Sequence, residues 1–399
     1  MLLLSLLAGC TSTTINTLSD KMYFIEVSVT DDIDGTEPQP FSAEPIQRSL
    51  AIRTLDGNGD PIAFTGDLKV TVRPGHIERG VQDEYISVEN GEIISGDETI
   101  SFQSAFGPTR IWLTDEGDKD ITSEREPTFA TGVSDIINFK FPTIAEFNKT
   151  TDSTGEPYIQ NTTNHLVSEF TEIDLEGRDV IAHTVSPSGF WVTDIEDYNS
   201  TDDGGYASLY VYTFSKPTGV SVGSRITKLT GGNQEYLGST QLSFPEYEVD
   251  EELALELLPE AKTLTGVQVC NTNNREYDNH RMESFESALV RIESATVNFA
   301  GDQQAIADYL EYGQWPVTFK DGNTECTMYI DSSALSYAFD PLEWDGQDIG
   351  PVSGVLNQIW SKWIILLNDD SSLSEAFSVG VPARPRHGMR RPVPRDPQR

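Results

Sequence analysis

The sequence predicts an all-β protein made of a two-sheet sandwich followed by one or two small closed barrels. Short runs of alternating apolar and polar residues, each ended by a turn-forming cluster, recur through residues 22–142. A second group of strand-like runs occupies residues 171–249, and one of them is apolar on both faces. The 399 residues are enough for two or three domains that each have a core.

About seven short strands are predicted in the N-terminal region. They lie at residues 23–29, 49–53, 68–73, 85–88, 99–102, 109–113 and 136–139. Turn sequences such as residues 56–61 and 89–91 separate them. This pattern is typical of an immunoglobulin-like (Ig-like) β-sandwich over residues 22–142, and the region resembles the Ig-like repeats of bacterial surface proteins. Residues 143–170 are rich in polar and turn residues and are expected to be a linker and edge segment.

The next region contains the strands expected to close a barrel. They lie at residues 189–194, 207–214, 222–231 and 235–242. Both faces of residues 209–214 are apolar, which suits a strand of a small barrel that is also covered on its outer side. Two short helices are expected further on, at residues 250–260 and 302–312.

The motifs of this region occur in a familiar order. Gly189-Phe190-Trp191-Val192-Thr193-Asp194 comes first, then Tyr210-Val211-Tyr212, then residues 222–231 and 235–242. This order resembles the OB-fold module N-terminal to the catalytic domain in some bacterial extracellular nucleases, with Ser224 where that module usually has Asp. Residues 283–292 and 351–360 resemble the β-module that follows it. The resemblance spans roughly residues 175–370. It implies an OB-like β-barrel at 171–249 and, at 250–380, a second β-module that completes or follows it.

The N-terminus predicts export and lipidation. Five leucines within the first seven residues lead into Ala8-Gly9-Cys10, as at the end of a bacterial lipoprotein signal peptide. Residues 1–9 would be removed, Cys10 would carry the lipid, and residues 10–21 would form a polar tether. Because Thr11 follows the cysteine, an outer-membrane or cell-surface location is expected. No basic residue precedes the leucines, so the true start lies upstream or the cysteine is there by chance.

Charge and cysteine content narrow the function classes. The formal net charge of −37 opposes binding to nucleic acid and to anionic membrane surfaces. Residues 381–399 break this pattern and are either a disordered basic tail or the product of a frameshift. In an oxidising compartment Cys270 and Cys326 are expected to form a disulfide; two free thiols or a metal site are the alternatives.

No catalytic constellation is present in the sequence. The five histidines, His76, His165, His183, His280 and His387, are scattered without a carboxylate at a spacing suited to a base and its orienting partner. Serine-nucleophile, dinucleotide-binding and phosphate-loop motifs are also missing. The chain ends where the catalytic domain of the nucleases would begin. The protein is therefore not expected to be an enzyme.

Two groups of candidate binding residues follow from these patterns. The candidate ligand surface consists of Trp191, Tyr198, Tyr206, Tyr210, Tyr212, Arg225 and Lys228. OB barrels stack bases on such aromatic residues, although the same residues also suit a barrel wall. The candidate calcium ligands are Asp56, Asn58, Asp60, Asp202 and Asp203, which lie in two loops that plain turns would equally explain. No other cofactor is expected.

The function predicted from the sequence is that of a non-catalytic, lipid-anchored binding or interaction module at the surface or in the periplasm. Its partners would be the membrane, through Cys10, and a protein or glycan. One alternative is an accessory protein that binds single-stranded nucleic acid, which the negative charge disfavours. The other is calcium-dependent adhesion or glycan binding.

Overall fold

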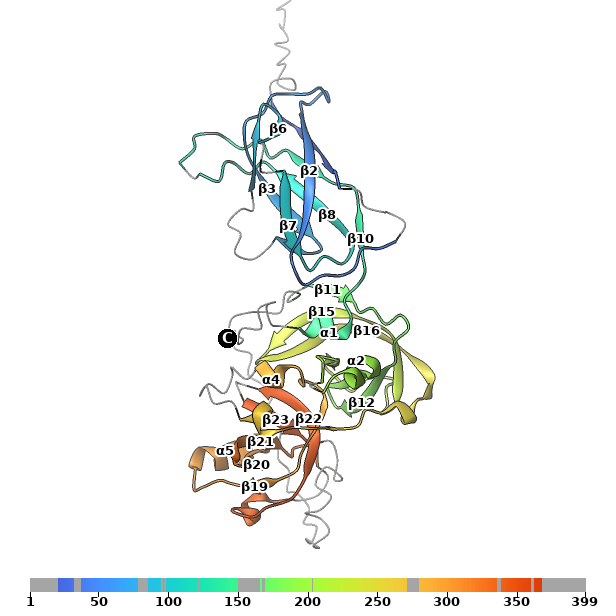
Figure 1. Ribbon diagram of the computed structural model, residues 1–399, viewed down its shortest axis with the longest axis vertical. Helices are drawn as coiled ribbons and strands as arrows, with labels where there is room; N and C mark the ends of the chain where they lie inside the picture. Colours follow the sequence, from blue (N-terminus) through green and yellow to red (C-terminus); the bar gives the residue numbers. More distant parts are fainter. Residues whose placement is uncertain are drawn as a thin grey trace, which may run out of the picture. The chain divides into compact units, whose positions relative to one another are not determined.

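The computed structural model contains two compact units, residues 1–140 and 141–399 (Figure 1). It describes residues 21–31, 37–77, 85–94, 96, 98–120, 122–149, 166, 169–202, 204–270, 280–335, 339–359 and 362–367. The predictions for the signal peptide, for Cys10 and for the tail at 381–399 lie outside these residues. No helix among the described residues is long and apolar enough to cross a membrane.

Unit 1 has ten strands in its described part. They are β1 (Phe24–Val29), β2 (Ile46–Leu55), β3 (Gly66–Arg73), β4 (His76–Ile77), β5 (Tyr85–Glu89), β6 (Glu92–Ile93), β7 (Thr99–Gln103), β8 (Gly107–Thr114), β9 (Thr131–Val133) and β10 (Ile137–Phe139). Pairing follows the path β4-β7-β2-β1-β9-β8-β3-β5-β6, and β10 pairs with β8. Strands β1 and β9 pair in parallel through the residue pair Phe24–Thr131. The other strand pairings of this sheet are antiparallel.

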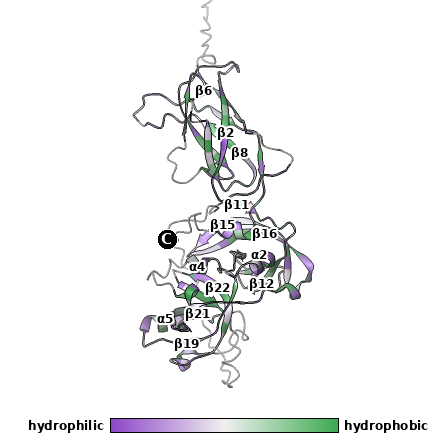
Figure 2. Cartoon of the chain, in the orientation of Figure 1, coloured by the Kyte–Doolittle hydropathy of each residue, from purple (hydrophilic) through white to green (hydrophobic). Residues whose placement is uncertain are grey.

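The two halves of this path share one hydrophobic core. Leu50 and Ile52 of β2 belong to the same buried cluster as Val70 of β3 and Leu113 of β8. Along β3 and β8, every second residue faces this cluster, and hydrophobic and hydrophilic residues alternate on the strands of unit 1 in Figure 2. Of the ten strands, β4, β6 and β9 were not predicted; each has only two or three residues.

Unit 2 begins with a closed five-stranded barrel, which we call the first barrel. Its strands are β12 (Val180–Ser186), β13 (Gly189–Asp194), β14 (Ser208–Tyr212), β15 (Ser224–Tyr236) and β16 (Ser239–Leu253). They pair in the order β12-β13-β14-β16-β15, and β15 returns to β12 through Arg225 and Ile181. The only parallel step of the ring is β14–β16. The short strand β11 (Phe170–Glu172) lies outside the ring on β15.

A seven-stranded sheet, which we call the second sheet, makes up the rest of unit 2. Its strands are β17 (Lys262–Thr263), β18 (Leu289–Ile292), β19 (Ala295–Val297), β20 (Gln314–Asp321), β21 (Thr324–Asp331), β22 (Val352–Ile359) and β23 (Lys362–Leu366). The order is β17-β18-β22-β23-β21-β20-β19. Only Glu293 and Ser294 separate β18 from β19, so one continuous segment pairs with both β22 and β20. If β18 and β19 are taken as one bent strand, the strands of the second sheet pair in the same order as those of the first barrel.

Short helices connect these strands. They are α1 (Ile144–Asn148), α2 (Ile195–Ser200), η1 (Leu255–Leu257), α3 (Gly266–Val269), α4 (His280–Glu283), α5 (Gln303–Tyr312) and η2 (Pro341–Trp344). The structure confirms the helix expected at 302–312, because Asp302 caps the N-terminus of α5 and Gly313, at φ 82°, ends it.

Two sequence predictions are wrong. The helix expected at 250–260 is absent except for η1, since β16 continues to Leu253 by pairing with β15 and strand pairing outweighs local helix propensity. The strand expected at 235–242 is a hairpin that turns at residues 237–238. The described part of segment 143–170, which was predicted to be a linker and edge segment, includes α1: Phe147 is buried, and the Asn148 side chain donates to the carbonyl of Tyr206.

Candidate ligand-binding face

Two aromatic side chains lie opposite each other on the outer side of the first barrel. Trp191 of β13 pairs with Tyr210 of β14, and their rings are stacked with centroids 4.4 Å apart. Their neighbours Phe190, Val192 and Leu209 are fully buried, so the alternation along each strand turns the two rings away from the barrel interior. The Tyr210 ring covers Gly189, where a Cβ would lie 2.7 Å from Tyr210 Cε2.

Tilted ring contacts extend this stacked pair into a row of five rings. Tyr212 follows Tyr210 at a centroid distance of 6.2 Å, Phe214 follows Tyr212 at 4.4 Å, and Phe244 follows Phe214 at 4.9 Å. We call Trp191, Tyr210, Tyr212, Phe214 and Phe244 the aromatic row. Its inner end is buried, with Trp191 7 % exposed, and its outer end is open, with Phe214 53 % and Phe244 72 % exposed.

The backbone at the open end is strained. Phe214 and Phe244 have φ values of 62° and 53°, in the left-handed region that bulky residues rarely adopt. Phe244 lies in a bulge, since β16 adds residues between the pairs Gly232–Ser243 and Thr230–Glu246. Such strain costs about 1–3 kcal/mol for each residue and is concentrated at functional sites.

Neutral polar side chains adjoin the row. Gln241 and Ser243 are the parallel neighbours of Tyr210 and Tyr212 on β16. The Gln241 Nε2 amide donates to the Gln234 carbonyl oxygen at 2.9 Å, and the Ser243 hydroxyl donates to the same oxygen at 2.6 Å. Tyr210 Oη lies 3.0 Å from the Ser188 hydroxyl, and burial raises the pKa of Tyr210. The row therefore combines flat apolar rings with amide and hydroxyl groups.

The structure brings only three of the seven predicted ligand-surface residues into this row: Trp191, Tyr210 and Tyr212. Tyr198 is buried instead, donates its hydroxyl to the carbonyls of Glu260 and Leu289, and has a pKa raised by burial. Tyr206 precedes β14, and its backbone amide donates to Ser284. Both therefore help to hold the first barrel against the segment that enters the second sheet.

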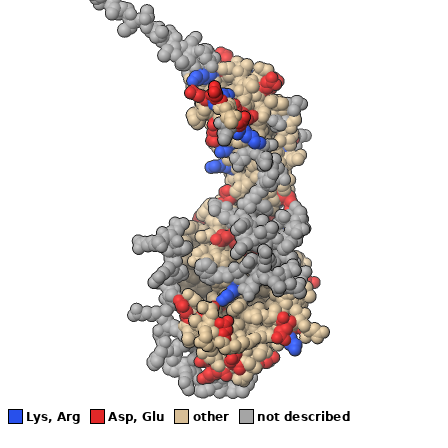
Figure 3. Space-filling view, turned by 90° about the vertical axis from the view of Figure 1, so that its left-hand side faces the viewer, with Lys and Arg blue, Asp and Glu red and all other residues tan. Residues whose placement is uncertain are grey.

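The two cations predicted for the ligand surface, Arg225 and Lys228, form ion pairs with carboxylates and are not part of the aromatic row. On β15, Arg225 forms ion pairs with Asp179 at 3.0 Å and Asp250 at 3.8 Å. Lys228 lies 2.8 Å from Glu246. Acidic side chains are spread over the described surface seen in Figure 3, with few basic ones among them. The sequence could not identify Phe214 and Phe244, because a turn and a bulge break the period-2 signal at both positions.

The predicted calcium loops differ from each other. The Asp56 carboxylate accepts the backbone amides of Asn58 at 2.8 Å and Asp60 at 3.0 Å, and the Asp60 amide is the main cause of its lowered pKa. Asp202 is exposed, and Asp203 lies outside the described residues. In the described part of the chain, no three His, Cys, Asp or Glu side chains are placed to hold a metal ion.

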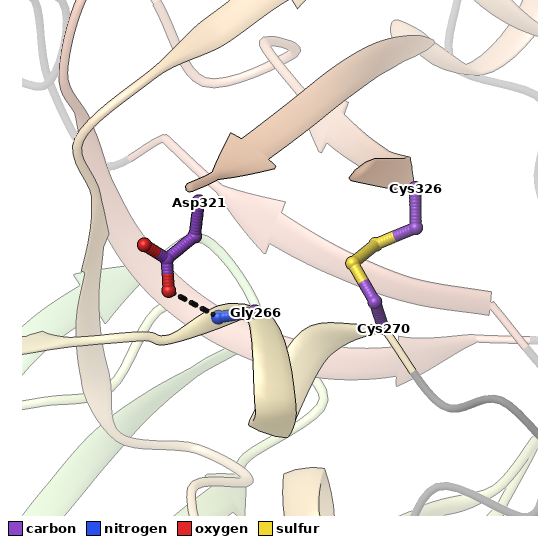
Figure 4. Close-up of a disulfide and its surroundings, with 4 residues drawn as sticks. All are labelled: Gly266, Cys270, Asp321 and Cys326. Carbon is purple, nitrogen blue, oxygen red and sulfur yellow. Dashed lines mark hydrogen bonds between the residues drawn. A yellow bond between two sulfur atoms is a disulfide. The ribbon is translucent and has the colours of Figure 1, made fainter. Parts of the chain in front are cut away.

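The Cys270–Cys326 disulfide predicted from the sequence is present, with an S–S distance of 2.05 Å. Figure 4 shows Cys270 at the end of α3 and Cys326 on β21. At the start of α3, the Gly266 amide donates to the Asp321 carboxylate at 2.8 Å. The disulfide and this hydrogen bond attach both ends of α3 to the β20–β21 hairpin.

The sequence did not predict a group of buried carboxyl groups at the tip of the β15–β16 hairpin. Glu235 lies beside Glu283 and Glu286, and burial raises the pKa of all three, that of Glu286 to about 8. Nearby His183 lies beside Ser287, and burial lowers its pKa to about 3. The group joins two of the sequence motifs, 235–242 and 283–292, which lie far apart in the chain.

Comparisons of the chain with family models, with curated proteins and with solved structures found no match. The aromatic row and the folds around it are therefore the observations on which a functional proposal rests.

Proposed function

We propose that this chain is an exported, lipid-anchored binding protein without catalytic activity, in which an Ig-like sandwich precedes two OB-like barrels. The ligand binds to the first barrel. The observation that carries this proposal is the aromatic row, which ends in two exposed and strained phenylalanines.

The strand order of unit 2 supports two OB-like barrels. In an OB barrel the second and third strands form the face that binds oligonucleotides or oligosaccharides. Counted from β12, the second and third strands here are β13 and β14, which carry Trp191, Tyr210 and Tyr212. The second sheet repeats the same order, and its ring contacts include Trp315–Phe339 and Phe339–Trp344.

The strand order of unit 1 supports the Ig-like sandwich. One half of its path, β1-β2-β7-β4, corresponds to one sheet of the fold, and the other half, β9-β8-β3-β5-β6, corresponds to the second sheet. A rigid sandwich between a lipid anchor and a binding barrel would act as a spacer.

The lipid anchor is tested by exchanging Cys10. The wild-type chain expressed in a bacterium should partition into the detergent phase after extraction with a phase-separating detergent. Cys10→Ser should partition into the aqueous phase because it has no thiol to acylate. Equal partitioning of both proteins would refute the anchor.

The ligand face is tested by titrating the full-length chain with oligo(dT) and with soluble glycans, each with and without calcium. Loss of binding in a Phe214→Ala/Phe244→Ala double variant that keeps its far-UV spectrum would support the row as the ligand face. If every ligand that binds the wild type binds the double variant equally well, the proposal that the row is the ligand face is refuted. Binding of oligo(dT) at physiological salt would favour the accessory nucleic-acid-binding function.

A further inference from the structure

We infer that the tip of the β15–β16 hairpin, residues 235–240, is a latch that holds the first barrel on the second sheet and releases it when nearby carboxyl groups ionise. From this tip, β16 continues directly to Gln241 and Ser243, beside the aromatic row. The inference does not depend on the proposed function, because it concerns contacts within unit 2. It rests on how the tip is attached, on the groups around the attachment, and on the position of the hydrophobic core of the second sheet.

Polar groups attach the tip to its neighbours. The backbone amide of Thr240 donates to Glu286 at 3.0 Å, in the segment that leads into β18. The Ser239 hydroxyl donates to the side-chain oxygen of Asn357 on β22 at 2.6 Å. The large side chain of Tyr236 at the tip is 43 % exposed. Hydrogen bonds and charge, more than buried apolar surface, therefore decide whether the tip stays in place.

Three carboxyl groups surround this attachment. Glu283 and Glu286 are each 7 % exposed, and the partly buried Glu235 accepts from the Thr240 hydroxyl at 2.5 Å. One oxygen of Glu286 has no hydrogen-bond partner among the described residues. None of the ion pairs between described residues involves these three groups. Their ionisation would place negative charges together where water is largely excluded, which is unfavourable.

The other described elements packed against these groups add no compensating charge. On β22, Asn357 and Gln358 have neutral side chains. On β12, the buried His183 has a pKa lowered to about 3 by burial, so it is uncharged at neutral pH. From the loop before β14, Tyr206 reaches the segment through its backbone amide, which donates to the carbonyl of Ser284.

The latch responds to pH with a defined sign. Burial raises the pKa of Glu286 from 4.5 to about 8, and burial together with the charge of Glu286 raises that of Glu283. When the tip leaves, water reaches these groups and their pKa values return toward the ordinary range. The open form thus releases a proton that the closed form retains, and each such group raises the ratio of open to closed protein by up to about tenfold per pH unit. The latch holds at acidic pH and loosens as the pH rises to about 8.

The first barrel and the second sheet can part at the tip without unfolding. The main hydrophobic cluster of the second sheet lies within residues 264–367 and includes no described residue of β12 to β16. A second attachment contains no carboxyl side chain: Tyr198 packs with Ala207 and Ala288, and its hydroxyl donates to the carbonyl of Leu289. This second attachment does not respond to the ionisation and would act as the pivot.

The test is hydrogen exchange of the full-length protein between about pH 5 and about pH 9, read at single residues. The Thr240 amide reports on the latch, because its acceptor is Glu286. Its protection factor, which corrects for the intrinsic exchange rate at each pH, should fall by up to roughly tenfold per pH unit until the pH reaches about 8. At every pH it should be lower than the protection factors of the amides in β13, which exchange when the barrel unfolds.

The test includes two variants. In Glu286→Gln the amide oxygen still accepts from Thr240 but does not ionise, so the fall in protection with pH should be shallower. Glu248→Gln changes an exposed residue of the same strand and should keep the fall seen in the wild type.

Three results would each overturn the inference. The protection of Thr240 does not fall with pH, or it equals that of β13 throughout, so that opening is unfolding of the barrel, or it falls as steeply in Glu286→Gln as in the wild type. If Glu286→Gln does not fold, the comparison of Thr240 with β13 in the wild type decides alone.

Discussion

The backbone amide of Thr240 donates to the carboxyl group of Glu286 at 3.0 Å and so joins the β15–β16 hairpin to the segment that leads into β18. The tip of the same hairpin reaches β22, where the Ser239 hydroxyl donates to the Asn357 side-chain oxygen at 2.6 Å. The first barrel and the second sheet therefore share a polar contact in which carboxyl groups are buried.

This contact predicts that the stability of unit 2 falls as the pH rises. The pKa of Glu286 is raised from about 4.5 to about 8, first by burial and then by the charge of Glu235. Between these values the unfolded chain releases a proton that the folded chain retains, so stability decreases with pH and is constant again above about 8. The raised pKa values of Glu235 and Glu283 act in the same direction.

Glu286→Gln is the matched variant, because its amide oxygen still accepts from Thr240 but does not ionise. Thermal melts between pH 4 and pH 9, roughly the window of the two pKa values, should show the variant gaining stability over the wild type as the pH rises. The buried His183 acts in the opposite direction below pH 6.5, but it does so in both proteins. Parallel stability curves for the two proteins would contradict the prediction.

Arg178→Ala should destabilise the first barrel. Arg178 Nη1 bonds to Asp194 Oδ2 at 2.5 Å and to Asp197 Oδ2 at 2.7 Å, and the Asp194 side chain is fully buried. Removal of the guanidinium leaves that carboxylate buried without its cation, which costs about 3 kcal/mol. Urea denaturation measures the change. The control is Lys228→Ala, which breaks an exposed ion pair with Glu246 and should change the stability little. If both variants lose similar amounts of stability, the buried ion pair of Arg178 does not stabilise the barrel more than an exposed one.

Phe244→Gly should be more stable than Phe244→Ala. Both variants lose the contact with Phe214, but only glycine relieves the positive φ of 53°. The expected difference is about 1 kcal/mol, since the relief of strain exceeds the entropic cost of glycine. Denaturant midpoints at equal m-values measure it. An alanine variant that is as stable as the glycine variant would show that the backbone at this bulge is not strained.

Reduction should destabilise unit 2 selectively. The Cys270–Cys326 disulfide spans 56 positions of the chain and attaches α3 to β21, so its loss should cost about 2–4 kcal/mol. Calorimetry with and without dithiothreitol should show a lower transition for unit 2 and an unchanged one for unit 1. A Cys270→Ser/Cys326→Ser double variant should melt at the lower temperature and be insensitive to the reductant. An unchanged melt of that variant would mean that the disulfide contributes nothing.

Asp56→Ala should lower the melting temperature of unit 1 to the same extent with calcium and with a calcium chelator. The Asp56 carboxylate accepts the amides of Asn58 and Asp60 and thereby holds its own turn. Asp60→Ala keeps these bonds, because only the backbone of Asp60 donates, and should have the smaller effect. A wild-type melting temperature that rises with calcium and an Asp56→Ala value that does not would instead indicate a bound ion.

Features that depend on residues close together in the sequence could be predicted from the sequence alone. The alternation in residues 68–73 and 109–113 identified β3 and β8, because strand periodicity is local. The helix expected at 302–312 is α5, whose ends are set by local capping at Asp302 and Gly313. The disulfide was predicted by counting the cysteines of a chain expected to be exported.

Features that depend on contacts between distant segments were decided by the tertiary structure. A helix was expected at 250–260, with acidic residues 250–252 in its first turn, but pairing with β15 makes residues up to 253 a strand. Phe214 and Phe244 lie in a turn and a bulge, and their rings meet only because β14 and β16 pair in parallel when the barrel closes. Glu235 and Glu286 carry no sign of burial in their local sequence, since desolvation depends on what covers a side chain. Periodicity thus determined the strands, and barrel closure determined which side chains could act together.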